Sequence, residues 1–234
     1  MLLTTRDRDI VAWIGRFGAV EAEQAMTWFG MGRTATYRRL RACVGSELLA
    51  HVRVLHGEPG LYVATRAGLQ WAGLGDFEPC RVSVALVRHV QASARAAVVL
   101  DRREPGMTVV HEREIRAAER SQGRVLASVA VGSLGAGRSR WHRPDLLLVP
   151  RQGDELPTAV ELELSVKSRR RLETICRGYA RSRLFAAVRY YAEPVPARAV
   201  ARTVEATRTG DLIRVLPIAS LLRGGLSGEA RDAA

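Results

Sequence analysis

Residues 141–167 read WHRPDLLLVPRQGDELPTAVELELSVK, and this stretch decides the fold of the second half of the chain. Its pattern predicts an apolar strand over residues 145–149, a polar turn, and a second strand over residues 158–165. Because side chains alternate along a strand, Glu161 and Glu163 share one face. Two carboxylates on one face of an apolar strand are costly unless a metal, a base or water compensates them. We therefore expect the chemistry of the chain at this hairpin.

The composition indicates a polyanionic partner. The chain has 234 residues, an ordinary apolar fraction of 47% and a formal net charge of +12, and Lys167 is the single lysine among its 36 basic residues. Arginine presents a planar fork of donors that suits phosphate. Nucleic acid is therefore the first expectation, and an anionic membrane surface the second. No apolar run reaches the roughly 20 residues that span a bilayer, so we expect no membrane protein.

Cysteine usage and the start of the chain bear on location. Cys43, Cys80 and Cys176 are odd in number and far apart, which gives neither a disulfide framework nor a zinc pattern. The opening MLLTTRDRD has no hydrophobic core of a signal peptide. Both observations favour a reducing, cytoplasmic location.

Residues 1–75 predict a helical unit that ends in a hairpin. The expected elements are helices at 5–17, 20–29 and 34–43, strands at 48–55 and 61–64, and a closing helix at 65–74. Thr5 is the expected N-cap of the first helix. Three helices followed by a two-stranded wing is the order of a winged helix-turn-helix domain. The phrase LYVATRAGLQWAGL resembles the wing and closing helix of many members of that group.

In such a fold the third helix lies in the major groove of double-stranded DNA, and the wing meets the backbone or the minor groove. The third helix should bury Tyr37, Leu40 and Val44. The residues that we expect on DNA lie on this helix and the wing, and they are Arg33, Thr34, Thr36, Arg38, Arg39, Arg41, Arg53 and His56. The alternative is a small helical domain whose arginines are only solvated.

The rest of the chain divides into three parts. Residues 76–106 predict a connector helix with small apolar side chains, which either packs between two domains or pairs with a second copy in a homodimer. Residues 107–222 predict a mixed α/β domain, and residues 223–234 a disordered tail. The predicted fold class is therefore α/β, or α+β over the whole chain. The elements expected in 107–222 are strands at 108–110, 125–131, 145–149, 158–165, 185–191 and 212–216, helices at 112–121, 169–183 and 196–207, and a basic loop at 132–140.

This order resembles the PD-(D/E)XK nuclease-like superfamily, because Pro144-Asp145 precedes a strand with Glu161 and a nearby lysine. The resemblance implies that Asp145, Glu161 and Glu163 hold Mg²⁺ or Mn²⁺ and that Lys167 assists the attacking water. Carboxylate oxygens suit Mg²⁺, and the ion lowers the pKa of a bound water. The lysine is displaced, however. The superfamily places it two residues after the acid, where this chain has Glu163 after Glu161, or Ser165 after Glu163.

Two readings of this hairpin stay open. In the first the metal site is intact. In the second the fold is degenerate, the acids pair with arginines, and the domain serves binding or dimerisation. In the second reading the arginines that pair with the acids are Arg140, Arg143 or the run Arg169, Arg170 and Arg171. As the leading hypothesis, we expect the arginine-rich helix predicted over 169–183, which this run begins, to contact the DNA backbone.

A winged helix-turn-helix followed by a PD-(D/E)XK-like domain, with the phrases HRPDLLLV and VELELSVKS, resembles the replication-relaxation family of bacterial mobile elements. The resemblance implies a DNA-binding protein of a plasmid, integrative element or phage-like locus, acting in replication, transfer or regulation, with a degenerate nuclease-like domain. One alternative is an active Mg²⁺-dependent DNA endonuclease or nickase. Another is a transcription regulator that uses its C-terminal domain only for dimerisation.

Overall fold

Two separate units make up the chain. The computed structural model describes residues 2–133 and 139–222, and its contacts separate Leu100–Leu221 from the residues up to Val99. Helices and mixed sheets occur together, so the predicted α/β class is confirmed. The predicted tail at 223–234 and the middle of the predicted basic loop lie outside the described residues. Within the described part, no helix has the length and apolar character needed to cross a membrane.

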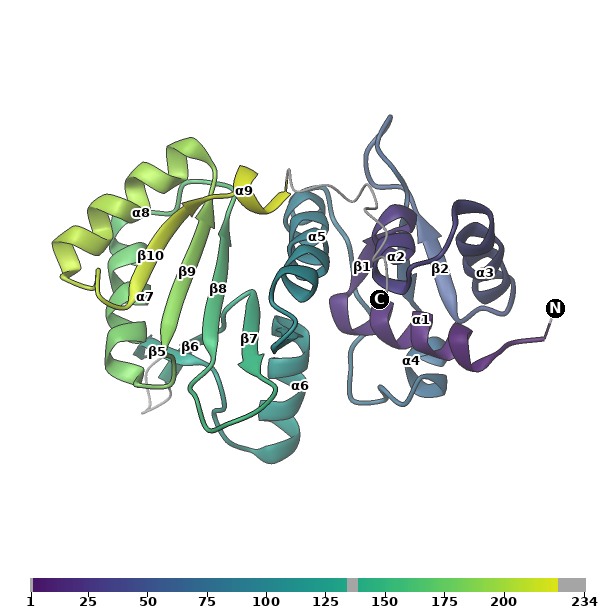
Figure 1. Ribbon diagram of the computed structural model, residues 1–234, viewed down its shortest axis with the longest axis horizontal. Helices are drawn as coiled ribbons and strands as arrows, with labels where there is room; N and C mark the ends of the chain where they lie inside the picture. The colour runs from purple at the N-terminus through teal and green to yellow at the C-terminus, as the bar shows by residue number, and fades with distance from the viewer. Residues whose placement is uncertain (1, 134–138, 223–234) are drawn as a thin grey trace, which may run out of the picture. The chain divides into compact units, whose positions relative to one another are not determined.

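The first unit joins several helices to a small sheet (Figure 1). Its elements are α1 (Thr5–Phe17), β1 (Ala19–Glu21), α2 (Ala22–Phe29), α3 (Arg33–Gly45), β2 (Leu49–Val52), β3 (Leu61–Ala64) and α4 (Arg66–Trp71). The three strands lie in the order β1-β3-β2, and both pairings are antiparallel. Strand β1 replaces the start of the helix predicted from residue 20, because Val20 pairs with Tyr62 of β3.

The start of α1 corrects one prediction. The N-cap is Thr4 rather than Thr5, because only Thr4 has an acid three residues later to complete a capping box. Asp7 is fully buried, and its Oδ2 accepts hydrogen bonds from the backbone and hydroxyl of Thr4, each at 2.8 Å. Nη1 of Arg39 lies 3.2 Å from the same oxygen. Asp7 therefore completes the N-terminal cap of α1 and also links α1 to α3 through Arg39.

A long helix, α5 (Val87–Arg103), covers part of the predicted connector. Its first residue packs in an apolar cluster with Ala19, Leu61 and Val63 of the first unit. The division between the two units falls within this helix, at Val99. Most of α5 therefore belongs to the first unit by its contacts, and the helix lies within the stretch 76–106 that the sequence predicts as a connector helix.

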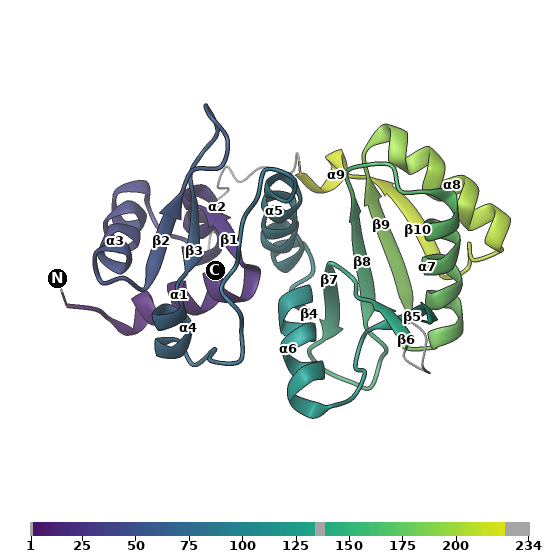
Figure 2. The same cartoon turned by 180° about the vertical axis from the view of Figure 1, so that it is seen from behind.

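The second unit is built on a five-stranded mixed sheet of order β10-β9-β8-β7-β4 (Figures 1 and 2). Its elements are β4 (Met107–His111), α6 (Glu112–Gln122), β5 (Val129–Ser133), β6 (Ser139–His142), β7 (Leu146–Pro150), β8 (Thr158–Glu163), α7 (Arg169–Ser182), β9 (Ala187–Ala192), α8 (Pro194–Thr207), β10 (Ile213–Pro217) and α9 (Ala219–Leu222). Strand β8 is central, antiparallel to β7 and parallel to β9. Strands β5 and β6 form a separate antiparallel hairpin.

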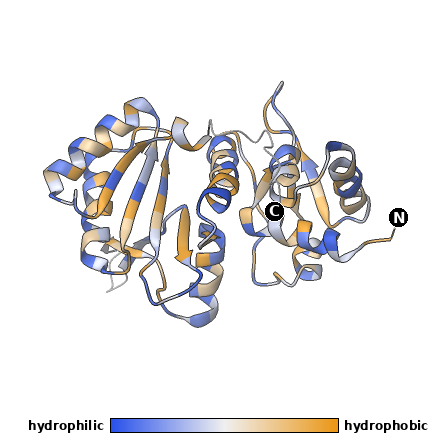
Figure 3. Ribbon diagram, viewed as in Figure 1, coloured by the Kyte–Doolittle hydropathy of each residue, from blue (hydrophilic) through white to orange (hydrophobic). Residues whose placement is uncertain are grey.

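One face of this sheet is covered by α7 and α8, which pack against each other (Figure 2). The strands of the sheet are mainly apolar or neutral, while the helices show mixed stripes (Figure 3). Ala159 lies in the core under the helices, so alternation along β8 turns Glu161 and Glu163 toward the same face. Helix α7 approaches the β5–β6 hairpin closely at Gly178, where a Cβ atom would lie 3.0 Å from the carbonyl oxygen of Ala130.

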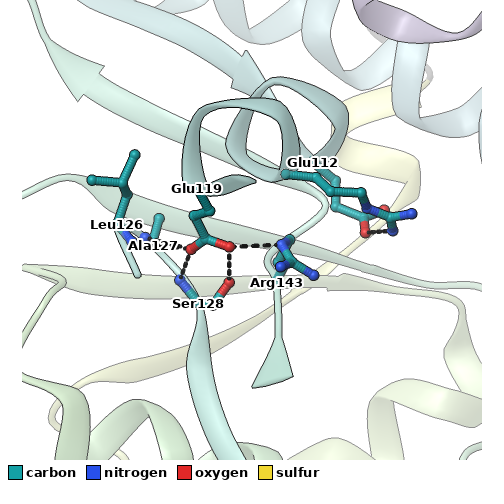
Figure 4. A network of polar contacts seen from close by, with 7 residues as sticks. Glu112, Glu119, Leu126, Ala127, Ser128 and Arg143 are labelled. Carbon is teal, nitrogen blue, oxygen red and sulfur yellow. Dashed lines mark hydrogen bonds and ion pairs between the residues drawn. The ribbon is translucent and has the colours of Figure 1, made fainter. Parts of the chain in front are cut away.

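Glu119 of α6 explains why β5 starts later than predicted (Figure 4). Its Oε1 accepts hydrogen bonds from the backbone N–H groups of Leu126, Ala127 and Ser128, at 3.1, 3.2 and 3.0 Å. Its Oε2 accepts from the Ser128 hydroxyl at 2.7 Å and from Arg143 Nε at 2.8 Å. The backbone donors that a strand would have used are thus satisfied by a side chain, and a loop forms instead.

Candidate functional site

Glu161 is a buried carboxylate on the central strand, and only 1% of its surface is exposed. Its Oε1 accepts a hydrogen bond from the hydroxyl of Tyr179 on α7 and lies 2.7 Å from Nε2 of His142 on β6. Burial acts to lower the pKa of His142, but the neighbouring charge of Glu161 outweighs it and the pKa is raised. Glu161 therefore holds the hairpin and α7 onto the sheet through polar contacts.

Glu163 is equally buried, at 2% exposed, and is paired with the displaced lysine. Although β8 ends at Glu163, the chain turns back and places Lys167 Nζ 2.5 Å from Glu163 Oε2. Burial raises the pKa of Glu163 despite this partner. Burial would lower the pKa of Lys167, but the charges of Glu161 and Glu163 raise it overall. Lys167 is therefore a protonated ammonium, suited to stabilising negative charge rather than to accepting a proton.

Asp145 stands just before β7 and closes its pairing with β8. Leu146 and Val160 are the last paired residues at this end, and the preceding Pro144 has no N–H to continue the ladder. The Asp145 Oδ2 accepts the N–H of Leu162 at 2.7 Å instead. Asp145 thus lies beside Glu161 and Glu163, as the sequence predicts, and supplies the acceptor for the Leu162 N–H beyond the last paired residues of β7 and β8.

The predicted metal ligands all accept hydrogen bonds from protein groups. Within residues 2–133 and 139–222, no group of three or more His, Cys, Asp or Glu side chains is placed to hold a metal ion. These hydrogen bonds are made by one oxygen of each carboxylate, namely Asp145 Oδ2, Glu161 Oε1 and Glu163 Oε2, and a bound Mg²⁺ would compete with the donors for those oxygens. The Mg²⁺ or Mn²⁺ site stays a prediction.

A basic cleft of about 660 Å³ lies between the β5–β6 hairpin and the start of α7, and we call it the arginine cleft. Arg140, Arg170, Arg171 and His142 contribute to its lining, but none of the three carboxylates does. The guanidinium groups of Arg170 and Arg171 are exposed and have no partner in the described part of the chain. His142 therefore connects the cleft to the buried Glu161.

The first turn of α7 concentrates positive charge where a helix favours anions. Ser168 caps the helix, and Arg169, Arg170 and Arg171 follow it directly. The helix dipole disfavours cations at this end. A bound anion such as phosphate is therefore expected to reduce the repulsion between these arginines and the positive end of the helix. Arg169 makes an exposed ion pair with Glu173 at 2.7 Å. It also lines a second cleft of about 760 Å³ together with Lys167.

Helix α3 presents most of the predicted DNA-contacting residues to solvent. Arg33, Thr34, Arg38 and Arg41 are exposed. Thr36 is a correction, because it is fully buried and its hydroxyl donates to Gly32 O at 3.1 Å. Thr36 thus cannot contact DNA.

Arg39 and the wing complete the set. Arg39 is half-buried by its contact with Asp7, so its first role is to join α3 to α1. Arg53 and His56, in the connection between β2 and β3, are both exposed. The structure therefore leaves six of the eight predicted residues of this unit open to solvent.

The sequence does not predict two residues of the site, Tyr179 and Tyr190. The helical spacing places Tyr179 on the apolar face of the helix predicted over 169–183, and nothing in that spacing indicates a contact with Glu161. Tyr190 lies beside Glu161 in the β8–β9 register, fully buried, and its hydroxyl has no hydrogen-bond partner within the described residues. The pairing of β8 with β9 reveals Tyr190, and the packing of α7 on the sheet reveals Tyr179.

Comparison of the chain with models of protein families, with curated proteins and with solved structures found no match.

Proposed function

We propose that this chain is a DNA-binding protein whose first unit reads duplex DNA as a winged helix-turn-helix. The observation that carries the proposal is the two-sided character of α3. One side is buried through Thr36, Leu40 and Cys43, while Arg38 and Arg41 on the other side face solvent. Helix α2 and a glycine turn precede α3, and the β2–β3 hairpin follows it. A winged helix-turn-helix has the same order of elements, and its third helix is the recognition helix that lies in the major groove.

The second unit adds backbone contacts in this proposal. The arginines at the start of α7 offer phosphate both bidentate donors and a positive helix end. The acidic cluster beneath them serves architecture, because its carboxylates accept hydrogen bonds from His142, Tyr179 and Lys167. The implied role is that of a mobile-element protein in replication, transfer or regulation.

The test measures the affinity of the full chain for labelled duplex DNA by fluorescence anisotropy, across a range of salt concentrations. Arg38→Ala and Arg41→Ala should each weaken binding several-fold, and each should reduce the salt slope by about one if it removes a phosphate contact. Arg88→Ala is the matched control, because Arg88 is exposed on α5 of the same unit and outside α3. Equal losses in all three variants would refute recognition by α3.

The Mg²⁺-dependent endonuclease is the alternative, favoured by one observation. Lys167 does reach Glu163, so the displaced lysine lies at the acidic cluster. Supercoiled plasmid is incubated with Mg²⁺ or Mn²⁺ and either the parent chain or Asp145→Ala. Nicking by the parent alone would establish the enzyme and overturn the purely architectural role. Absence of nicking, together with a shift of one duplex sequence, would leave the binder or a transcription regulator.

A further inference from the structure

Trp141 is an aromatic side chain that the core does not use. It is 42% exposed, whereas Trp13 in the first unit is 4% exposed. It lies on β6, where its backbone pairs with Ala130 of β5. Within the described residues its ring has neither an aromatic partner nor a cation above it. A single exposed apolar residue is ordinary, so the surroundings of the ring decide whether it matters.

Those surroundings are strongly basic on both sides. Trp141 lines the arginine cleft and also a further cleft of about 650 Å³ beside α6, which we call the hairpin cleft. The arginine cleft contributes Arg140, Arg170 and Arg171, and the hairpin cleft Arg116, Arg120, Arg124 and Arg143. Seven arginines thus line the two clefts that meet at one exposed aromatic ring.

Part of this charge has no acidic partner within the described residues. Glu119 is the one carboxylate in the lining of the hairpin cleft, and Arg143 contacts it (Figure 4). Arg116 pairs with Glu112. Arg124 donates only to the neutral Gln122, at 3.0 Å. Together with the unpartnered Arg170 and Arg171, this leaves a net positive surface on each side of Trp141.

We propose that Trp141 is a stacking platform for an unpaired base of single-stranded DNA, with the flanking phosphates held in the arginine and hairpin clefts. Proteins bind single strands by combining a basic groove with aromatic rings on which bases stack. The bases of an intact duplex are already stacked on one another and cannot reach such a ring. The site therefore selects a single strand or an opened duplex, a different form of DNA from the one proposed for α3.

The test compares labelled single-stranded and duplex 20-mers of the same sequence on the full chain, by fluorescence anisotropy. Trp141→Ala should weaken single-strand binding about five- to 150-fold, the range reported for loss of one base–aromatic stack. Trp141→Phe should retain most of the affinity, because a ring remains. Duplex affinity should change less than twofold. Val166→Ala is the control. Val166 is an exposed apolar residue of the same unit, and it lines the cleft of about 760 Å³ that Lys167 and Arg169 also line.

An abasic strand separates stacking from charge. It keeps the phosphates but has no bases, so the parent chain and Trp141→Ala should bind it equally. Thermal unfolding of each variant checks that the fold is intact. Unchanged single-strand affinity in Trp141→Ala, or an equal loss on the abasic strand, would overturn the stacking site. Because the site lies wholly in the second unit, neither result depends on duplex binding by α3.

Discussion

Lys167 Nζ lies 2.5 Å from Oε2 of Glu163, four residues earlier, and the two form a pair that is largely shielded from water. The pair puts an ammonium group at the acidic cluster even though the lysine comes late in the sequence. It also gives the buried Glu163 carboxylate a counter-charge. In the described structure Lys167 is therefore a partner of Glu163.

Lys167→Met should destabilise the second unit by about 2–4 kcal/mol at pH 7, because it leaves a buried carboxylate without its counter-charge. The measurement is urea unfolding. Arg169→Met is the matched control, since Arg169 and Glu173 have the same spacing but Arg169 is 81% exposed, and it should cost at most about 1 kcal/mol. Similar losses in both variants would contradict a special role for the buried pair.

The deficit of Lys167→Met should also depend on pH. Burial already raises the pKa of Glu163 above its ordinary value of 4.5, and loss of the ammonium raises it further. When the pKa of a carboxyl group is higher in the folded than in the unfolded state, the protein loses stability as the pH rises through that folded-state pKa. The variant should therefore approach the parent in stability below pH 4.5 and fall behind as the pH rises. A deficit that is constant from pH 4 to 8 would argue against this cause.

Glu119→Gln should cost about 2–3 kcal/mol at pH 7, because the carboxylate accepts several charge-assisted hydrogen bonds. Burial acts to raise the pKa of Glu119, but the hydrogen bonds from Ser128 and the 126–128 backbone and the charge of Arg143 lower it overall. This contribution is present above the ordinary pKa of 4.5 and is lost as the pH falls through the lower folded pKa. Urea titrations of both proteins from pH 7 to 2.5 should show the curves converging.

The two tyrosines beside Glu161 should respond in opposite directions to loss of the hydroxyl. Tyr179→Phe removes a hydrogen bond to a buried carboxylate and should cost about 1.5–3 kcal/mol. Tyr190→Phe removes a buried hydroxyl without a partner and should be neutral or stabilising by about 1 kcal/mol. Thermal unfolding of the pair provides its own control. A large loss in Tyr190→Phe would mean that its hydroxyl has a partner, such as a buried water.

In the first unit, Asp7→Asn should lower the free energy of unfolding by about 1–3 kcal/mol, because it weakens a helix cap and removes the charge that faces Arg39. Asp9→Asn is the matched control, since Asp9 is exposed in the first turns of the same helix. Chemical denaturation measures both. If Asp9→Asn is the more harmful change, the cap and its link to α3 are not what stabilises this unit.

The sequence predicts the long, regular helices and strands well. It predicts poorly which side chains of a polar helix face inward and where very short strands lie. Strand β8 is recognisable because the apolar Val160 and Leu162 alternate with Glu161 and Glu163, and α7 because Leu172, Ile175, Cys176 and Tyr179 recur at helical spacing. In α3 the sequence predicts Tyr37, Leu40 and Val44 as the buried face. Leu40 is buried as predicted, but Thr36 and Cys43 are buried in place of Tyr37 and Val44, and the Thr36 hydroxyl is satisfied there by Gly32 O. Strand β1 has only three residues, too few to show an alternation.

For the site, the sequence supplies the acids and Lys167 but not the partners of Glu161 and Asp145. Asp145, Glu161 and Glu163 belong to one hairpin, so their proximity follows from strand pairing. His142 comes from a polar strand that has no apolar pattern, and Tyr179 from a helix that reads as core. Whether a carboxylate faces a metal or a protein donor depends on these distant residues, and short-range spacing does not contain that information.

Gly178 links α7 to the hairpin that carries Trp141 through a contact with almost no spare room. A methyl group added at position 178 would have to push the helix and the hairpin apart by a few tenths of an ångström, without changing any charge. Gly178→Ala would therefore test whether the spacing between α7 and the hairpin matters for the nucleic-acid site that we propose at Trp141, through a residue that does not line either cleft.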